Sequence, residues 1–561
     1  MNKITYYTLA KSIVLIVFLS SFLFSSGQNS NNFEISKNLD IYATLFKEIN
    51  KNYVDEIEVG ELMKTGIDAM LESLDPYTIY IPESEVEDYK FITTGQYGGI
   101  GALIHKQGDT IMISEPYEGK PAQKYGLKAG DIILEVDNKT VSGKSTSDVS
   151  TLLKGQPGTN VDILLKRYGI VEPVSMELTR DNVKIDNIPY YTVLDQNVGY
   201  IKLSGFTQNA AKEVKNAFLE MKKENELSGI ILDLRNNGGG LLQEAVRIVN
   251  IFIDKGEPVV STKGKLASKN YSYVTQESPV DTEIPLIVLV NGASASASEI
   301  VAGGIQDHDR GVIIGQNTFG KGLVQNVLPI SYNSQAKITV AKYYIPSGRC
   351  IQEIDYSHKD ENGDAGQIPD SLIAAFETKN GRPVYDGHGI KPDIELSNSI
   401  ISNVSIALLN KFLFFSFATM FQDEHENIAG ADDFEITDEI YDEFIAFIEE
   451  EGYDYTTKCE KTLANLKKTA EKEDYFDAIN EEYLALANKI KANKESDVVK
   501  YQEEIKRILR IEIISRYYFQ TGKIVSSLKD DEEIAKAKEL LNEKSSYVEL
   551  LASSGEKSTN N

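Results

Sequence analysis

The sequence predicts a multidomain α/β protein in which helical segments flank a β-rich module and a core of alternating strands and helices. Its 561 residues exceed what a single hydrophobic core supports. Between residues 187 and 396 apolar strand-like runs alternate with helical patterns, whereas residues 95–180 form short strand patterns separated by glycine turns. The content of 41% apolar and 25% charged residues is that of folded protein.

Helices are predicted for the N-terminal segment, residues 35–92. Apolar residues recur at spacings of three and four between Leu39 and Tyr53. A second helix over residues 62–74 ends before Pro76, whose ring cannot continue it. In the β-rich module that follows, residues 93–182, we expect strands at 111–114, 132–136 and 161–167 and a helix at 148–153.

The core, residues 183–402, is predicted to place its functional groups where strands lead into helices. Residues 286–290 are almost continuously apolar, as in a strand that is covered on both faces. The pattern predicts further strands at 199–203 and 230–234 and helices at 210–223, 241–252 and 297–306.

A helical region is predicted for residues 403–550, followed by a polar, disordered tail at 551–561. Thr437 is a plausible cap before apolar residues at helical spacing. We expect the apolar faces of these helices to pack on the protein itself. A homo-oligomer formed through the helical segments is the alternative.

The first 27 residues have the pattern of a signal peptide. Lys3 and Lys11 precede an apolar run over residues 13–24, and the small residues 25–27 follow. The run is shorter than the roughly 20 residues that span a bilayer. We therefore expect export to the periplasm with cleavage near Gly27. An uncleaved, membrane-associated form is the alternative.

The net charge and the cysteine content bear on nucleic-acid binding and on disulfide bonds. With 58 basic and 85 acidic side chains the net charge is −27, so we expect no nucleic-acid partner. Cys350 and Cys459 are too few for a disulfide framework. We expect both to be free thiols, although a disulfide is permitted outside the cytoplasm.

Ser296 and Lys321 carry the chemistry that the sequence predicts. Ser296 lies in the small-residue loop 291–299, Asn-Gly-Ala-Ser-Ala-Ser-Ala-Ser-Glu, and Lys321 lies between two glycines 25 positions later. A serine needs a base to remove its proton during attack, and a lysine can serve only when burial keeps it neutral. Gln325 could hold the amine in place. Gly-Lys-Gly alone fits an exposed loop lysine equally well, but together with the serine loop it favours a Ser/Lys hydrolase.

Histidine is the usual base for a serine nucleophile, and the sequence contains five histidines. His308 follows the predicted helix in a polar stretch, where a solvated helix end is the simpler interpretation. His388 lies in a glycine turn, and no partner pattern surrounds His105, His358 or His425.

A third motif, Leu-Asp-Leu-Arg-Asn-Asn-Gly-Gly-Gly at residues 232–240, predicts a strand that runs into a glycine turn at a helix start. N–H groups in such a turn can face a developing oxyanion. A tight turn without any ligand is the alternative. A phosphate loop is disfavoured because no Gly-Lys-Ser/Thr ending follows.

These motifs, together with Gly-His-Gly-Ile-Lys-Pro-Asp at 387–393, resemble the carboxyl-terminal processing peptidases, or tail-specific proteases. The resemblance covers residues 35–400 and leaves the later helical region unexplained. It implies an S41-type protease core of the crotonase/ClpP-like kind with an inserted PDZ domain.

The resemblance also assigns roles to residues. It makes Ser296 the nucleophile, Lys321 the base and Gln325 its helper. Ala297 and Gly239 become the oxyanion donors, with Gly238 almost equally suited to the second position. Glu299, which closes the serine loop, is expected to be structural rather than catalytic.

The β-rich module resembles a PDZ domain through Tyr-Gly-Gly-Ile-Gly-Ala-Leu-Ile at residues 97–104. Gly99, Ile100 and Gly101 would present N–H groups to the terminal carboxylate of a substrate, and the tail would add as a strand. Val149, Leu152 and Leu153 would line a pocket for its last side chain or belong to the domain core.

The sequence thus predicts an exported serine endopeptidase that binds protein C-termini and needs no metal or nucleotide. A non-catalytic PDZ scaffold or periplasmic chaperone is the alternative of another class. An α/β protein that handles acyl thioesters is a third.

Overall fold

The computed structural model describes residues 32–396 and 401–552, which divide into two compact units, residues 1–80 and 81–561. In the first unit residues 32–52 are helical and α2 spans Val59–Glu72, so both predicted helices are confirmed. The predicted signal segment and residues 553–561 of the predicted tail lie outside the described residues. The short strand β1, Ile79–Ile81, leads into the second unit, where α3 spans Val86–Thr94.

The β-rich module is a sheet in the order β3-β4-β5-β7-β8, with β6 paired to β5. The predicted strands and the predicted helix are present, and their apolar residues form one core. Ser145 caps the helix α5 and Asp148 completes a capping box. The strands are β3 (Ala102–Gln107), β4 (Thr110–Pro116), β5 (Ile132–Val136), β6 (Lys139–Thr140), β7 (Asn160–Lys166) and β8 (Val174–Thr179), with the helices α4 (Pro121–Lys124) and α5 (Thr146–Leu153) and a separate pair β2 (Gln96–Gly99) and β9 (Asp181–Lys184).

The core sheet has the order β10-β11-β12-β15-β16-β23 and is parallel except for the pairing of β10 with β11. Every residue of β12 and β15 is buried, as expected of strands covered on both faces. The strands are β10 (Tyr190–Leu194), β11 (Val198–Lys202), β12 (Gly229–Asp233), β15 (Leu286–Val290), β16 (Val312–Gly315) and β23 (Ile394–Glu395), and the helices are α6 (Ala210–Glu224), α7 (Leu242–Phe252) and α8 (Ala297–Asp307). The predicted alternation is therefore confirmed.

An antiparallel sheet that the sequence did not predict adjoins this core. In it β18 pairs with both β13 and β17, and β13 pairs with β14. The strands are β13 (Pro258–Gly264), β14 (Tyr271–Val274), β17 (Leu323–Pro329) and β18 (Gln335–Tyr344), and the shorter ones that follow are β19 (Ile354–Lys359), β20 (Ala365–Gln367), β21 (Ala375–Glu377) and β22 (Pro383–Tyr385). This sheet bears on the site because β17 directly follows residues 320–322, Gly-Lys-Gly, here called the lysine loop.

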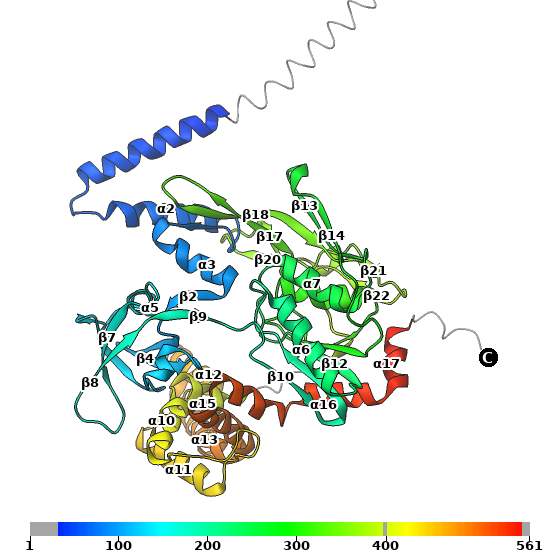
Figure 1. The fold of residues 1–561 in the computed structure, drawn as a ribbon. Helices are drawn as coiled ribbons and strands as arrows, with labels where there is room; N and C mark the ends of the chain where they lie inside the picture. The colour runs from blue at the N-terminus through cyan, green and yellow to red at the C-terminus, as the bar shows by residue number, and fades with distance from the viewer. Residues whose placement is uncertain (1–31, 397–400, 553–561) are drawn as a thin grey trace, which may run out of the picture. The chain divides into compact units, whose positions relative to one another are not determined.

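The helical region packs on itself and on the core sheet. Thr437 caps α11 as predicted, and Phe417 and Phe444 meet edge to face in an apolar core of its own. Residues of α16 and α17, coloured red in Figure 1, share a second core with β12 and β16. The helices are α9 (Asn403–Asn410), α10 (Leu413–Glu424), α11 (Asp438–Glu450), α12 (Lys458–Lys472), α13 (Phe476–Glu495), α14 (Asp497–Lys500), α15 (Gln502–Leu528), α16 (Glu532–Asn542) and α17 (Lys544–Leu551).

Two further observations bear on the predicted environment. Within the described residues no single helix is long and apolar enough to span a membrane, and only α9 and α10, which are bent by 64° to each other, reach that length and composition together. Cys350 and Cys459 are both free, as predicted.

Candidate active site

Ser296 occupies the turn between β15 and α8, at the carboxyl end of the parallel sheet. Its backbone angles are φ 57° and ψ −111°, which lie outside the ordinary regions for a non-glycine residue. Such a conformation costs about 1–3 kcal/mol and is typical of residues held in place for chemistry. Ala297 then begins α8, where the N–H groups of the first turn have no partners within the helix.

The structure distinguishes Ser296 from the two neighbouring serines. The Ser294 and Ser298 side chains are fully buried, and their hydroxyls donate to the carbonyls of Leu234 and Asn237 at 2.9 and 2.8 Å. Ser296 is only half-buried. The outer two serines therefore hold the loop through buried hydrogen bonds, whereas the middle one is the more exposed of the three.

The lysine loop lies against neighbouring backbone at both glycines. A Cβ on Gly320 would come 2.5 Å from the Glu353 Cβ, and one on Gly322 would come 2.9 Å from the Gln352 nitrogen. Gly320 also has φ +80°, which favours glycine. The two glycines thus let half-buried Lys321 lie close to the segment that follows β18.

Glu299 joins the serine loop to the lysine loop. Its Oε2 accepts hydrogen bonds from the backbone N–H groups of Ser296 and Lys321 at 2.7 and 2.9 Å. Its Oε1 accepts from the Thr318 hydroxyl at 2.6 Å and from the Gly320 N–H at 2.7 Å. The side chain is fully buried, and burial raises its pKa to about 7 although the four hydrogen bonds oppose the rise.

Tyr343 makes a second link between the same two backbones. Its hydroxyl lies 2.5 Å from the Lys321 carbonyl oxygen and 3.2 Å from that of Ser296. The side chain is 1% exposed and comes from β18. Nothing in the pattern of residues 335–344 marks one tyrosine as different from the next, so the sequence does not single this residue out.

The turn after β12, residues 234–240 and here called the oxyanion turn, packs directly on the serine loop. The Asn237 carbonyl accepts from the Ala295 N–H and from the Ser298 hydroxyl. The Asn237 Oδ1 accepts the Gly239 N–H at 2.9 Å. The N–H predicted as an oxyanion donor is therefore engaged within its own turn in this structure.

Gly239 and Gly238 provide a matched pair of substitutions. A Cβ on Gly239 would lie 2.7 Å from the Ala295 carbonyl oxygen and 2.9 Å from the Ala297 nitrogen, at φ +100°, whereas one on Gly238 would meet nothing within 4 Å. We expect Gly239→Ala to lower the kcat of peptide cleavage by at least about 100-fold, the scale of a lost oxyanion donor. Gly238→Ala should stay within about threefold of wild type in the same assay. Equal kcat values in the two variants would contradict this prediction.

Gln325 and the histidines complete the predicted residues. Gln325 lies on β17 beside a register shift, and its Nε2 donates to the Thr339 hydroxyl at 3.2 Å. Its assistance to Lys321 stays a prediction. His308 caps the C-terminal end of α8, which at 1.5 Å per residue places it roughly 18 Å from Ser296, and its Nε2 contacts the Pro258 carbonyl oxygen.

The late glycine motif packs behind the lysine loop. A Cβ on Gly389 would lie 2.6 Å from the Thr318 hydroxyl oxygen, and the Ile390 N–H donates to that same oxygen at 2.7 Å. Because Thr318 in turn donates to Glu299, the motif supports the link between the two loops. His388 contacts Asp370 instead.

Comparison with protein-family models identifies three parts of the chain. Residues 197–358 match the model of Peptidase family S41, and residues 112–167 match that of a PDZ domain. Residues 404–541 match the model described as Probable PDZ-protease, C-terminal helical domain, which accounts for the region that the resemblance had left unexplained.

Full-length relatives decide the family. The Carboxy-terminal-processing protease of Bartonella bacilliformis is 35% identical over 344 residues, which cover 60% of this chain and 79% of the relative. The Carboxy-terminal processing protease CtpA of Bacillus subtilis is 30% identical over 446 residues, which cover 79% and 93%. The chain belongs to the carboxy-terminal processing proteases. A solved photosystem II D1 C-terminal processing protease is 27% identical and covers 64% of this chain and 93% of its own, with a TM-score of 0.34.

In the PDZ domain of this carboxy-terminal processing protease, β3 is an edge strand of the sheet. Within the described residues β3 pairs only with β4, so its other edge carries no strand. Gly101 precedes β3 at φ +74°, and a Cβ on it would come 2.5 Å from the Lys120 Cβ. Val149 and Leu153 belong to the buried core of the domain, and Leu152 packs half-buried against it.

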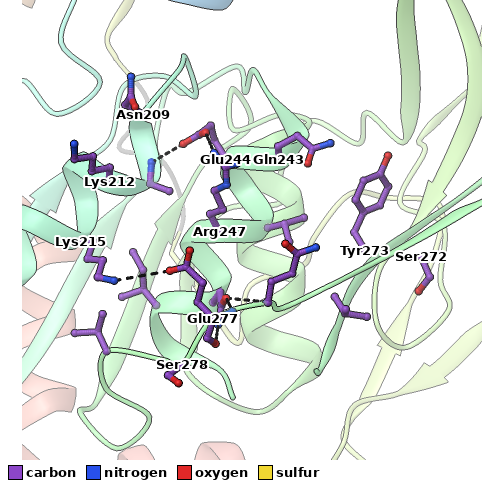
Figure 2. A pocket seen from close by; sticks show the side chains of 17 residues that line it. Asn209, Lys212, Lys215, Gln243, Glu244, Arg247, Ser272, Tyr273, Glu277 and Ser278 are labelled. Carbon is purple, nitrogen blue, oxygen red and sulfur yellow. Dashed lines mark hydrogen bonds and ion pairs between the residues drawn. The ribbon is translucent and has the colours of Figure 1, made fainter. Parts of the chain in front are cut away.

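A polar cleft of about 500 Å³ lies between the starts of α6 and α7 and the strand β14 (Figure 2). Four of its five charged side chains are paired, Arg247 with Glu244 at 2.7 Å and Lys215 with Glu277 at 3.9 Å, and the fifth is Lys212. None of the predicted site residues lines it. Among the described residues no group of three or more His, Cys, Asp or Glu side chains is arranged to hold a metal ion.

Proposed function

We propose that this carboxy-terminal processing protease is an exported serine endopeptidase with a Ser296/Lys321 dyad. The observation that carries the proposal is the joint fixing of both residues. Ser296 has a strained backbone at a helix start, and Glu299 and Tyr343 each contact both its backbone and that of Lys321. Two buried side chains that hold the same two loops together are what a dyad requires.

In the proposed reaction the Ser296 Oγ attacks the scissile carbonyl while the neutral Lys321 amine takes its proton. The Ala297 N–H and an N–H of the oxyanion turn stabilise the resulting oxyanion. Gly239 fills this second position if its N–H leaves the Asn237 Oδ1, and Gly238 is the alternative donor. The ammonium returns its proton to the leaving amine, and an acyl-enzyme remains. Lys321 then activates the water that hydrolyses this ester, with Gln325 orienting the amine.

Three serine variants test the nucleophile. We expect Ser296→Ala to abolish labelling by a serine-directed acylating probe and cleavage of a quenched fluorescent peptide with an apolar C-terminal residue and a free carboxylate. Ser294→Ala and Ser298→Ala are matched controls, because each removes a buried hydroxyl from the same loop. Both controls should still be labelled. Labelling of Ser296→Ala at the wild-type rate would refute the proposed nucleophile.

We also propose that Gly99, Ile100 and Gly101 bind the terminal carboxylate of the substrate and that its tail adds beside β3. On the Ser296→Ala variant, a peptide with a free C-terminus should bind at least about tenfold more tightly than the same peptide ending in an amide, because only the former carries the charge. Fluorescence anisotropy measures both affinities. Equal affinities would show that the tail end is not what the domain recognises.

The basic and apolar pattern of residues 1–27 supports export to the periplasm with removal of this segment. A mature chain that begins before Gly27, found by mass spectrometry of the native protein, would favour a membrane tether instead.

For the core we propose a crotonase/ClpP-like arrangement, supported by the parallel strands with their helices α6, α7 and α8 and the adjoining antiparallel sheet. A non-catalytic scaffold is not favoured, because the family is one of proteases. Association of the helical segments into a homo-oligomer remains a prediction that analytical ultracentrifugation would test.

A further inference from the structure

Arg235, in the oxyanion turn, is held by acids from the far end of the chain. Its Nη1 lies 2.6 Å from Glu533, and its Nη2 lies 2.8 Å from Asp531. The same guanidinium contacts Asp233, the last residue of β12, at 2.7 Å. The three side chains of the outer group, Arg235, Asp531 and Glu533, are only 16%, 13% and 14% exposed.

Asp531 and Glu533 are fixed by the start of α16. Asp531 caps this helix and accepts the N–H groups of Glu533 and Ile534, both at 3.0 Å. The apolar face of α16 is buried against the core sheet, where Ile534 and Leu541 pack with Ile231 of β12. The helix that begins at these two acids is therefore held on the core sheet along its apolar face. Figure 1 shows α16 beside the core strands.

Around Arg235 two cations, Lys202 and Arg235 itself, face three carboxylates. Lys202 lies 3.0 Å from Asp233 and donates to the Arg235 carbonyl, so two cations share one carboxylate of the core. Burial alone would raise the pKa of Asp233, but Arg235 and Lys202 lower it below its usual value. The two acids at the start of α16 add two negative charges beside Arg235, so the group carries one more negative than positive charge.

The two residues that follow Arg235, Asn236 and Asn237, both contact the serine loop. The Asn236 N–H donates to the side chain of Asn291, which opens that loop, and Asn237 receives its contacts from Ala295 and Ser298. Arg235 is thus the first fixed point of the oxyanion turn after β12.

We propose that Asp531 and Glu533 are positioning residues for the oxyanion turn, acting through Arg235. The inference rests on the proposed function, since it assumes that this turn serves Ser296. It assigns a part in catalysis to the C-terminal helical region, whose Glu533 lies 298 residues from Arg235 in the chain.

The test compares kcat and KM for the quenched peptide in four variants of the full chain. Asp531→Asn with Glu533→Gln removes both charges, and asparagine still caps the helix. We expect this double variant to lower kcat at least about tenfold with KM within about twofold, a fraction of what a lost oxyanion donor costs. Glu532→Gln, the exposed acid between them, is the matched control and should leave kcat unchanged.

Arg235→Gln separates positioning from mere stabilisation. If the acids act through Arg235, adding Asp531→Asn and Glu533→Gln to Arg235→Gln lowers kcat no further. The inference is overturned if the acid substitutions lower kcat in the Arg235→Gln background by the same factor as in the wild type. It is also overturned if the double acid variant keeps more than half the wild-type kcat. Should the double variant fail to fold by circular dichroism, Glu533→Gln alone decides by the same criteria. If Ser296→Ala is inactive while the acid variants match wild type, only this inference fails; if Ser296→Ala is active, the proposed function fails.

Discussion

Replacing Lys321 with alanine should lower kcat/KM for peptide cleavage by at least about 1000-fold. The serine hydroxyl would lose the only base that the proposal gives it, and general-base catalysis contributes about 100- to 10,000-fold. The loop itself should persist, because Glu299 and Tyr343 hold its backbone. Steady-state kinetics with the quenched peptide and circular dichroism of the same sample give both readouts.

Lys321→Arg provides the diagnostic control. An arginine keeps a positive charge of similar reach but cannot give up its proton near neutral pH. We therefore expect Lys321→Arg to be as inactive as Lys321→Ala. In the wild type, kcat/KM should fall as the pH drops through the pKa of the lysine, because only the neutral amine accepts a proton. Activity above a tenth of wild type in either variant would remove Lys321 from the role of base.

The sequence was sufficient wherever a local pattern carried the information. The apolar run at Leu286–Val290 marked a buried strand, and the small residues after it marked a sharp turn into a helix. The glycines on either side of Lys321 permit close backbone contact, and the structure shows that contact against Gln352 and Glu353. Each of these features depends on residues within one short stretch.

The contacts that fix the site join segments far apart in the chain, and no local pattern predicts them. Tyr343 reaches Ser296 across 47 positions, and Glu533 reaches Arg235 across 298. The antiparallel sheet that carries Tyr343 was missed for the same reason, since a strand does not specify its partner. The hydrogen bond from Gly239 to Asn237 was likewise missed, because it depends on how one turn folds on itself.

Replacing Glu299 with glutamine should lower kcat about 100-fold while KM changes little. The carboxylate accepts four hydrogen bonds, two on each oxygen. A glutamine offers one oxygen and one amide nitrogen, so two of the four donors would face another donor. Each such buried, unsatisfied group costs about 1–3 kcal/mol. The Ser296 and Lys321 backbones would then lose their common anchor.

The same variant should change how stability depends on pH. The folded-state pKa of Glu299, about 7, lies above its ordinary value of 4.5. Between these values the folded state binds more protons than the unfolded state, so the free energy of unfolding falls as the pH rises from about 4.5 to 7. The full loss is up to about 3 kcal/mol for this fully buried group. Glutamine does not titrate, so urea unfolding of Glu299→Gln should show a flatter dependence across that window.

Glu244→Gln is the matched control for both effects. Glu244 is also a buried glutamate, 4% exposed, and it accepts the Ala211 N–H at 2.9 Å, away from the serine loop and the lysine loop. We expect it to reduce stability and to leave kcat within about threefold of wild type. A Glu299→Gln variant with the kcat of Glu244→Gln would mean that Tyr343 and the glycine contacts suffice to hold the proposed dyad.

Tyr343→Phe removes only the hydroxyl that contacts the Ser296 and Lys321 carbonyl oxygens. It should lower kcat by less than Glu299→Gln, because the loss of these two contacts leaves no buried charge or donor unpaired.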